Sequence, residues 1–317
     1  MKPSLKLFYA SDIHGSELVF RKFLKAAAFY GTDAVIFGGD LTGKSIVPLV
    51  RTVEGLYRGL AYDAVRDLAP GAELAAAEQS IRDGGSYPYL TTPEEVAEME
   101  RDPEHLRRVF SEVMRATAEM WVSMADEKLR EAGIPALMMP GNDDEPAVKQ
   151  MLAQGDWIID AEGRAVELGD YRVLSYGYAT TTPWHSPREV TEEDMGKALD
   201  RLSSEGDLRA LTILNLHDPP SKSGLDLAYR MSSEFQVQMA GGQAMLTPVG
   251  STAVRELIER IQPVLALHGH IHESRGVAKI GKTVAINPGS SYTEGVLQGV
   301  IVTLSGDKVV GQQLVTG

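Results

Sequence analysis

Short, continuous runs of apolar residues recur along the chain, and each run ends in polar residues. The five clearest are LKLFYA (5–10), DAVIFGG (33–39), IPALMMPG (134–141), LTILNL (211–216) and PVLALHG (263–269). Runs of this length without polar alternation are typical of strands that are buried on both faces. We therefore predict five central strands, each followed by a polar loop.

Amphipathic helical patterns lie between these runs. Segment 16–31 places apolar residues near one face and ends at Gly31, segment 191–206 opens with a Thr-x-x-Asp capping signal, and segment 251–263 repeats apolar residues at helical spacing. The last quarter differs, because segments 276–291 and 295–315 have the pattern of β-hairpins. The chain is therefore predicted to be an α/β protein with mixed sheets.

Residues 44–131 interrupt the alternation of strands and helices. Stretches rich in Pro, Gly and Tyr come first, and a long amphipathic pattern over 103–133 follows. We predict a mainly helical cap or lid, inserted into a single domain that spans 1–317. Met120 and Trp121 belong to the apolar stripe of the long helix, and we interpret that stripe as packing rather than as a cofactor site.

Composition narrows the classes of function. The 317 residues carry a net charge of −13, which argues against non-specific nucleic-acid binding because such binding needs a basic face. Cysteine is absent, so disulfides, thiolate metal sites and thiol nucleophiles are excluded. The first 15 residues lack the pattern of a targeting peptide, and no apolar run approaches a membrane span, so we expect a cytoplasmic protein without membrane association.

Residues that could bind a metal ion lie at the ends of the five predicted strands. In open α/β sheets, ligands bind beyond the carboxyl ends of the strands. Alone, Asp12 could cap a helix, Asp40 and Asn142 could build turns, and His217 could cap a strand end. Two D-x-H or H-x-H pairs, however, have the spacing that points both side chains to one side of an extended chain. Together the strand ends supply seven oxygen and imidazole ligands suited to Mn, Fe, Zn or Co: Asp12, His14, Asp40, Asn142, His217, His270 and His272.

The ordered blocks D-x-H, G-G-D, G-N-D-D, H-D-P-P and G-H-I-H resemble those of the calcineurin-like metallophosphoesterase superfamily. The resemblance implies a four-layer α/β/β/α sandwich with two divalent metal ions, of which we favour Mn. It assigns one ion to Asp12, His14, Asp40 and His272. It assigns the other to Asp40, Asn142, His217 and His270, with Asp40 as the bridge.

One block departs from the common family pattern. Many members read G-N-H-D or G-N-H-E, and that histidine is taken to protonate the leaving group, whereas Asp143 and Asp144 follow Asn142 here. The resemblance is therefore to a subgroup with G-N-D-D. The candidates for the acid are His268, His185 and metal-bound water, and Asp144 could orient the turn by accepting backbone N–H bonds.

We count Asn142, His14, Asp143 and His268 as the candidate catalytic residues, His14 because it could assist the phosphate as well as bind metal. For His268, a hydrogen-bonded structural role is the leading interpretation. It is the first of three histidines in LHGHIHES, one residue before the G-H-I-H block.

The resemblance implies a hydrolase in which metal-activated hydroxide attacks the phosphorus of a small phosphorylated substrate. The motif loops hold few basic residues, with Lys44, Lys222 and Arg275 the nearest in sequence. A diester carries less charge than a monoester, so this scarcity favours a phosphodiester or nucleotide-type substrate. The alternatives are a phosphomonoesterase and a metal-binding, non-catalytic scaffold of the same fold.

Overall fold

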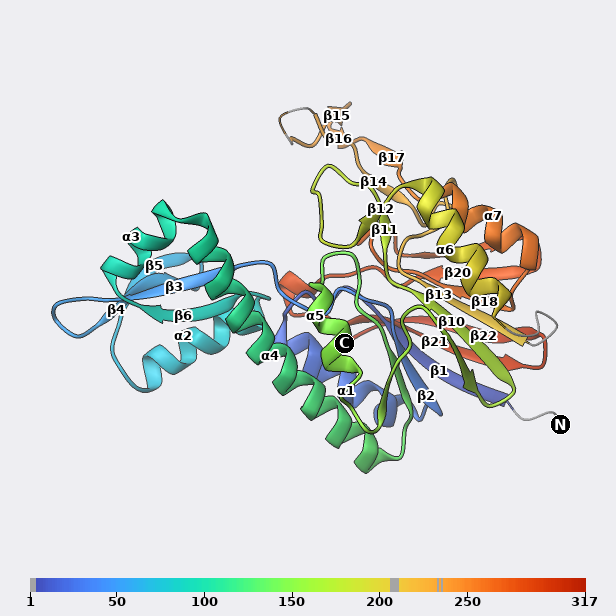
Figure 1. Ribbon diagram of the computed structural model, residues 1–317, viewed down its shortest axis with the longest axis horizontal. Helices are drawn as coiled ribbons and strands as arrows, with labels where there is room; N and C mark the ends of the chain where they lie inside the picture. Colours follow the sequence, from blue (N-terminus) through green and yellow to red (C-terminus); the bar gives the residue numbers. More distant parts are fainter. Residues whose placement is uncertain (1–3, 206–210, 233, 235) are drawn as a thin grey trace.

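A computed structural model describes residues 4–205, 211–232, 234 and 236–317 (Figure 1). The body of the molecule contains two six-stranded sheets. The first has the spatial order β22 (Lys308–Thr316), β21 (Gln298–Ser305), β1 (Ser4–Ala10), β2 (Ala34–Phe37), β7 (Ala136–Met138) and β8 (Ile158–Asp160). β1, β2, β7 and β8 are parallel, whereas β21 is antiparallel to both of its neighbours, β1 and β22.

The second sheet also contains four parallel strands. Its spatial order is β19 (Gly276–Ile280), β20 (Thr283–Asn287), β18 (Leu265–Leu267), β13 (Leu211–Leu216), β10 (Tyr171–Tyr176) and β9 (Ala165–Leu168). The four inner strands are parallel, and the two edge strands are antiparallel. All five predicted central strands and both predicted hairpins, β19–β20 and β21–β22, are therefore confirmed, and both sheets are mixed.

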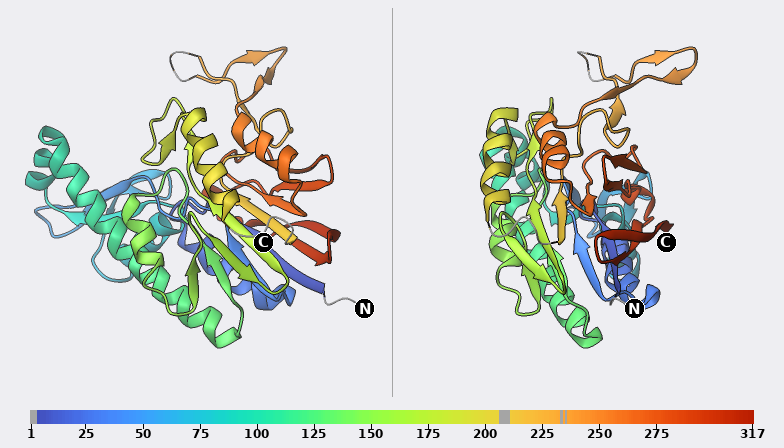
Figure 2. Two further views of the ribbon diagram at one scale, coloured as in Figure 1. Left: turned by 45° about the vertical axis from the view of Figure 1, so that its right-hand side comes forward. Right: turned by 90° about the vertical axis from the view of Figure 1, so that its right-hand side faces the viewer.

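Helices cover the outer faces of the two sheets (Figure 2). The first sheet carries α1 (Glu17–Tyr30), α4 (Pro103–Ala132) and α5 (Pro146–Leu152), and the second carries α6 (Glu192–Ser204) and α7 (Thr252–Ile261). Gly31 ends α1 in the left-handed conformation, and the Thr191 hydroxyl caps α6 by accepting the N–H of Asp194. The α/β/β/α sandwich is the fold that the sequence predicted.

Alternation along the strands explains why the apolar runs are continuous. On β1, Leu7 and Tyr9 face the layer between the sheets, while Phe8 and Ala10 face the helices. On β13, Ile213 faces the inner layer and Leu214 faces α6 and α7. Each central strand contributes to two cores, so apolar residues are needed on both of its faces.

Residues 44–101 and the start of α4 form a side lobe, at the left of Figure 1. Its other helices are α2 (Ala72–Asp83) and α3 (Pro93–Arg101), whereas α4 packs into the core of the body from Met114 to Leu129. The lobe also holds an unpredicted four-stranded sheet in the order β5 (Ala64–Leu68), β4 (Tyr57–Ala61), β3 (Ile46–Arg51) and β6 (Tyr87–Thr91). The parallel pair at one side of this sheet, β3 and the edge strand β6, joins segments about 40 residues apart, which local patterning does not reveal.

Smaller elements complete the chain. β11 (Ala179–Thr180) pairs with β12 (Glu189–Val190), β14 (Leu227–Tyr229) pairs with β17 (Leu246–Pro248), β15 (Met239–Ala240) pairs with β16 (Gln243–Ala244), and η1 (Tyr292–Glu294) is a short 3-10 helix. The β14–β17 segment projects from the body in both views of Figure 2. Among the helices described, none is long and apolar enough to cross a membrane.

Helix α4 joins the lobe to the body through Trp121. Its ring stacks on Phe20 of α1, with centroids 4.3 Å apart and 5° between the planes, and Trp121 is 2% exposed. The packing interpretation is confirmed for Trp121 but wrong for Met120, which is 47% exposed. The adjacent residue on a helix points about 100° away, so only one of the two faces the core.

We expect Trp121→Ala to lower the free energy of unfolding by about 3–5 kcal/mol, because it leaves a large cavity between α1 and α4. Met120→Ala is the matched control and should cost less than about 1 kcal/mol. Urea denaturation followed by circular dichroism measures both. Equal losses for the two variants would show that α4 is not held by this ring.

Candidate metal centre

The loops after five central strands meet at one edge of the two sheets. Backbone hydrogen bonds join the loop after β1 to the loop after β2: the N–H of Asp12 donates to the carbonyl of Gly39, and that of His14 donates to the carbonyl of Asp40. The N–H of Gly269, after β18, donates to the carbonyl of His217, after β13. The predicted site therefore forms from residues up to 260 positions apart in the chain.

The backbone at this edge is strained. Asp12, His14, Asp40 and His270 have φ values of 57°, 44°, 56° and 64°, in the left-handed region that non-glycine residues rarely occupy. Each such backbone conformation costs on the order of 1–3 kcal/mol, and it is kept where contacts with the surrounding structure enforce it. Four of the seven predicted metal-binding residues have this strained backbone, as expected where side chains must point toward one metal site.

Asp12, His14, Asp40 and His272 lie together. His14 Nε2 is 2.9 Å from His272 Nε2, 3.6 Å from Asp40 Oδ2 and 3.9 Å from Asp12 Oδ1, and His272 Nε2 is 3.5 Å from Asp12 Oδ1. Asp12, His14 and His272 can offer their ligand atoms to one metal ion. These are the four residues that the resemblance assigned to the first ion.

His217 and Asn142 extend the group on the other side of Asp40. His217 Nε2 lies 3.3 Å from Asp40 Oδ2 and 3.0 Å from Asn142 Oδ1. Asp12, Asp40 and His217 form a second group able to hold an ion. Asp12 belongs to both groups, and Asp40 lies within 3.6 Å of one histidine from each, His14 and His217.

Close backbone packing brings Asn142 to Asp40. A Cβ on Gly141 would lie 2.1 Å from Asp40 Oδ1 and 2.3 Å from the Asp40 backbone nitrogen, so only glycine fits there. The N–H of Asp143 also donates to Asp40 Oδ1, at 2.9 Å. The loop after β7 therefore lies directly against the Asp40 carboxylate.

His270 lies further from the cluster than the other ligands. Its ring centroid is 5.4 Å from that of His217, and among the described residues it joins none of the three-residue groups that could hold an ion. Its backbone N–H donates to Asp12 Oδ1 at 3.1 Å. Its role as a ligand of the second ion stays a prediction.

Burial and mutual attraction decide the charges of these groups. Burial would raise the pKa of Asp12 and Asp40, but the nearby histidines outweigh it and hold both pKa values below the usual range. Burial would lower the pKa of His217, but Asp40 and Asp12 raise it to about 10. Burial lowers the pKa of His14 to about 3. The metal-free site therefore pairs two carboxylates with a protonated His217, whose proton a metal ion must displace.

Asp144 joins the loop after β2 to the loop after β7 by hydrogen bonds. It is fully buried and accepts the backbone N–H groups of Leu41, Thr42 and Gly141 at 2.8–3.0 Å, as the sequence interpretation had suggested for this residue. Its Oδ1 also accepts the Thr42 hydroxyl at 2.6 Å. One carboxylate thus joins the loop that carries Asp40 to the loop that carries Asn142.

We expect Asp144→Ala to lower the free energy of unfolding by about 3 kcal/mol or more, because three buried N–H donors lose their acceptor. Metal affinity should fall about 10- to 100-fold as the two loops separate, which is the effect usual for residues that support ligands. Asp156→Ala, at an exposed carboxylate near the end of α4, is the control. Calorimetric titration with Mn²⁺ and chemical denaturation measure the two effects, and an unchanged metal affinity would contradict this role.

Asp143 occupies the position of the missing family histidine. Its Oδ1 accepts the Ser186 hydroxyl and the Asn142 amide, and its Oδ2 contacts Lys44 Nζ and lies 4.0 Å from His14 Nδ1. Asp143 can also join His14 and Asp40 in holding a metal ion. The sequence interpretation missed Ser186, and it noted Lys44 only as a nearby basic residue.

The two histidines that are candidates for the acid lie in different environments. His268 is fully buried, its Nδ1 is 2.9 Å from the Leu216 carbonyl, and burial lowers its pKa to about 4. This is the kind of structural position favoured for it from the sequence, and its acid role stays a prediction. His185 is exposed in the loop between β11 and β12, one residue before Ser186.

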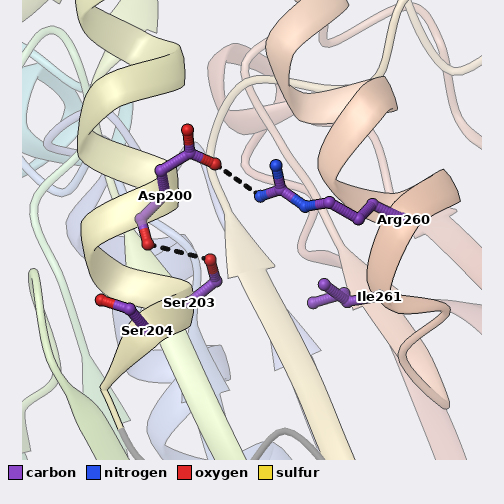
Figure 3. A pocket seen from close by; sticks show the side chains of 5 residues that line it. All are labelled: Asp200, Ser203, Ser204, Arg260 and Ile261. Carbon is purple, nitrogen blue, oxygen red and sulfur yellow. Dashed lines mark hydrogen bonds and ion pairs between the residues drawn. The ribbon is translucent and has the colours of Figure 1, made fainter.

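A separate hollow of about 560 Å³ lies between α6 and α7 (Figure 3). Arg260 pairs with Asp200 across it at 2.6 Å, and Ser203, Ser204 and Ile261 complete its described lining. These residues belong to the outer helical layer and to none of the five blocks. We therefore place the candidate site at the strand ends rather than in this hollow.

Comparisons with known proteins agree with this fold. The uncharacterized protein MJ1162 of Methanocaldococcus jannaschii is 28% identical over 166 residues, which cover 51% of this chain and 68% of that protein. One crystal structure aligns over 99% of both chains with a TM-score of 0.55 and 13% identity. That of TT1561 of Thermus thermophilus covers 96% of this chain and 99% of its own, with a TM-score of 0.50 and 15% identity. At these identities the structures share the fold, and no protein-family model matches the chain.

Proposed function

We propose, from a fold and five ordered blocks that are consistent with a calcineurin-like metallophosphoesterase, that this chain is a metal-dependent hydrolase of phosphoric esters. The observation that carries the proposal is the arrangement around Asp40. Its carboxylate lies 3.6 Å from His14, 3.3 Å from His217 and one hydrogen bond from the Asp143 backbone, so three separate loops converge on it.

The residues suit two divalent ions such as Mn²⁺. Carboxylate, amide and imidazole ligands without sulfur match Mn, Fe, Zn or Co. One ion would be held by Asp12, His14, Asp40 and His272, and the other by Asp40, Asn142, His217 and His270. Bound divalent ions of this kind supply a nucleophile from water at neutral pH and stabilise charge on phosphoryl oxygens.

Supporting contacts orient the ligands for this task. His217 Nδ1 lies 2.8 Å from the Gly38 carbonyl, so its N–H donates there and Nε2 is left to face the site. The Asp12 carboxylate accepts the Ser11 hydroxyl and the His270 N–H. These contacts hold the ligand atoms of His217 and Asp12 toward one centre.

Charge supports a phosphodiester or nucleotide-type substrate over a monoester. Among the basic side chains of the described residues, Lys44 is the one with an ion pair to a candidate catalytic residue, Asp143. A monoester carries about two negative charges at neutral pH and gains more from additional cations than a diester does. A phosphomonoesterase and a non-catalytic, metal-binding scaffold are the alternatives.

Hydrolysis of bis-p-nitrophenyl phosphate and p-nitrophenyl phosphate tests the proposal. We expect Mn²⁺-dependent release of nitrophenol, faster from the diester, that EDTA abolishes and added Mn²⁺ restores. Faster release from the monoester would favour the phosphomonoesterase. Protein that binds Mn²⁺ but releases nitrophenol from neither ester would be a scaffold, and the proposed function would be wrong.

A further inference from the structure

Lys44 lies where the side lobe begins, four residues after Asp40. Its ammonium group contacts Asp143 Oδ2, and the same oxygen lies 4.0 Å from Nδ1 of the predicted ligand His14. The side chain of Lys44 is 51% exposed, whereas that of Asp143 is 17% exposed. Lys44 therefore stands at the open rim of the metal centre with part of its surface facing solvent.

The lobe holds the backbone on both sides of Lys44. The Tyr87 hydroxyl accepts the N–H of Gly43 at 2.7 Å, and the N–H of Tyr87 donates to the carbonyl of Ser45 at 2.9 Å. A Cβ on Gly43 would lie 2.4 Å from the carbonyl oxygen of Gly85, so the two segments are in direct backbone contact. The lobe thus sets the position of Lys44, although Lys44 acts at the edge of the sandwich.

The partner of Lys44 is itself held in place. Asp143 Oδ1 accepts the Ser186 hydroxyl and the Asn142 amide, which leaves Oδ2 for Lys44. An ammonium group has three N–H donors, and Asp143 Oδ2 can take one of them. The others are free to face a ligand at the centre, while the lysine offsets a carboxylate that would otherwise repel an anion.

The charge of Lys44 reaches the predicted ligands. Burial would lower the pKa of Lys44, but Asp143 and Asp40 raise it, so the side chain is a cation at neutral pH. Tyr292 closes the same side of the site, with its ring centroid 4.8 Å from that of His14 and 5.9 Å from that of His272. A positive charge thus lies close enough to Asp40 and His14 to lower the pKa of both.

We propose that Lys44 is a substrate-binding residue whose ammonium group donates to a phosphoryl oxygen of the ester, with Asp143 as the residue that positions it. This inference rests on the proposed function and deepens it. It explains the departure at Asp143, since the Asp143–Lys44 pair returns a cationic donor to the place where G-N-H-D chains have histidine. The hydrogen bond from Lys44 is strongest to a dianionic phosphoryl group, so Lys44 should strengthen the binding of monoesters more than that of diesters.

Three variants test the inference in the Mn²⁺-loaded protein: Lys44→Met, Lys44→Arg and, as the control, Lys197→Met at an exposed lysine of α6 that pairs with Glu193. Inorganic phosphate is the probe, titrated by calorimetry. We expect Lys44→Met to weaken phosphate binding about tenfold or more, the usual effect of losing one charge-assisted hydrogen bond. Lys44→Arg should recover most of the affinity, and Lys197→Met should change it less than about twofold.

Two further readouts separate binding from structure. Metal content and thermal unfolding of Lys44→Met should match those of the wild type, and KM should rise more for p-nitrophenyl phosphate than for the diester. Phosphate affinity within twofold of the wild type, loss of bound metal, or wild-type protein that binds no phosphate would each overturn the inference. Wild-type protein that binds phosphate through Lys44 but hydrolyses neither ester would refute the proposed function alone.

Discussion

Replacing Asp40 with asparagine is expected to lower metal-dependent phosphoesterase activity at least about 1000-fold, equivalent to about 4 kcal/mol of transition-state stabilisation. Asp40 is the proposed bridging carboxylate, 3.6 Å from His14 and 3.3 Å from His217. Asparagine keeps its size and one oxygen but removes the negative charge, so each of the two proposed ions would lose a carboxylate ligand. Steady-state kinetics and metal analysis of the purified variant measure the effect.

Asp67→Asn is the matched control for this substitution. Asp67 is an exposed carboxylate of the lobe that pairs with Arg58, far from the five blocks in sequence. Its loss should change activity less than about twofold, as is usual for surface ion pairs. If Asp40→Asn kept a tenth or more of the wild-type activity, Asp40 could not be a bridge between two ions.

Metal affinity is expected to rise with pH, by up to about tenfold for each pH unit below 10 for each proton displaced. Asp40 and Asp12 hold a proton on His217 by raising its pKa to about 10, against the effect of burial. A metal ion needs the Nε2 lone pair and must therefore release that proton. Calorimetry of Mn²⁺ binding between pH 6 and 8, in two buffers of different ionisation enthalpy, counts the protons released.

The same shift gives the stability of the metal-free protein the opposite dependence on pH. Because the pKa of His217 is raised in the folded state, its contribution to stability is fully present below about pH 6.5 and is lost as the pH rises toward 10. The increase in melting temperature caused by Mn²⁺ should therefore grow with pH. His105→Gln, at a partly exposed histidine of α4, should leave the proton count unchanged, and a wild-type affinity that is independent of pH would contradict the protonated state of His217.

The sequence predicted the local elements well because each depends on a local pattern. The runs that became β1, β2, β7, β13 and β18 are apolar on both faces, and both hairpins carry their own turn residues. The helix ends at Gly31 and Thr191 follow from capping chemistry between neighbours in the chain. Asp144 could also be interpreted in advance, since a carboxylate next to a turn commonly accepts its N–H groups.

The lobe was harder to predict because its structure depends on pairing at a distance. β3 and β6 are separated by the β4–β5 hairpin and α2, and each short segment contains a proline, Pro48 or Pro88, which argues against a strand. Helix α4 also belongs to both the lobe and the body. Its buried face includes Met114, Ala118 and Trp121 but not Met120, because α1 packs against the side of α4 that carries Trp121.

By itself, the sequence determined an α/β protein with mixed sheets and the order of the five blocks, because strand burial and the position of a residue at a strand end are local properties. The four-layer sandwich was implied by the resemblance that those blocks carry. Only the tertiary structure decided which side chains meet. It placed Asp12, Asp40 and His217 in one group, left His270 beside that group, and brought Lys44 and Ser186 to Asp143. The physical reason is that contacts among residues 40 to 260 positions apart depend on how the two sheets and the lobe pack, and no local pattern in the chain encodes that packing.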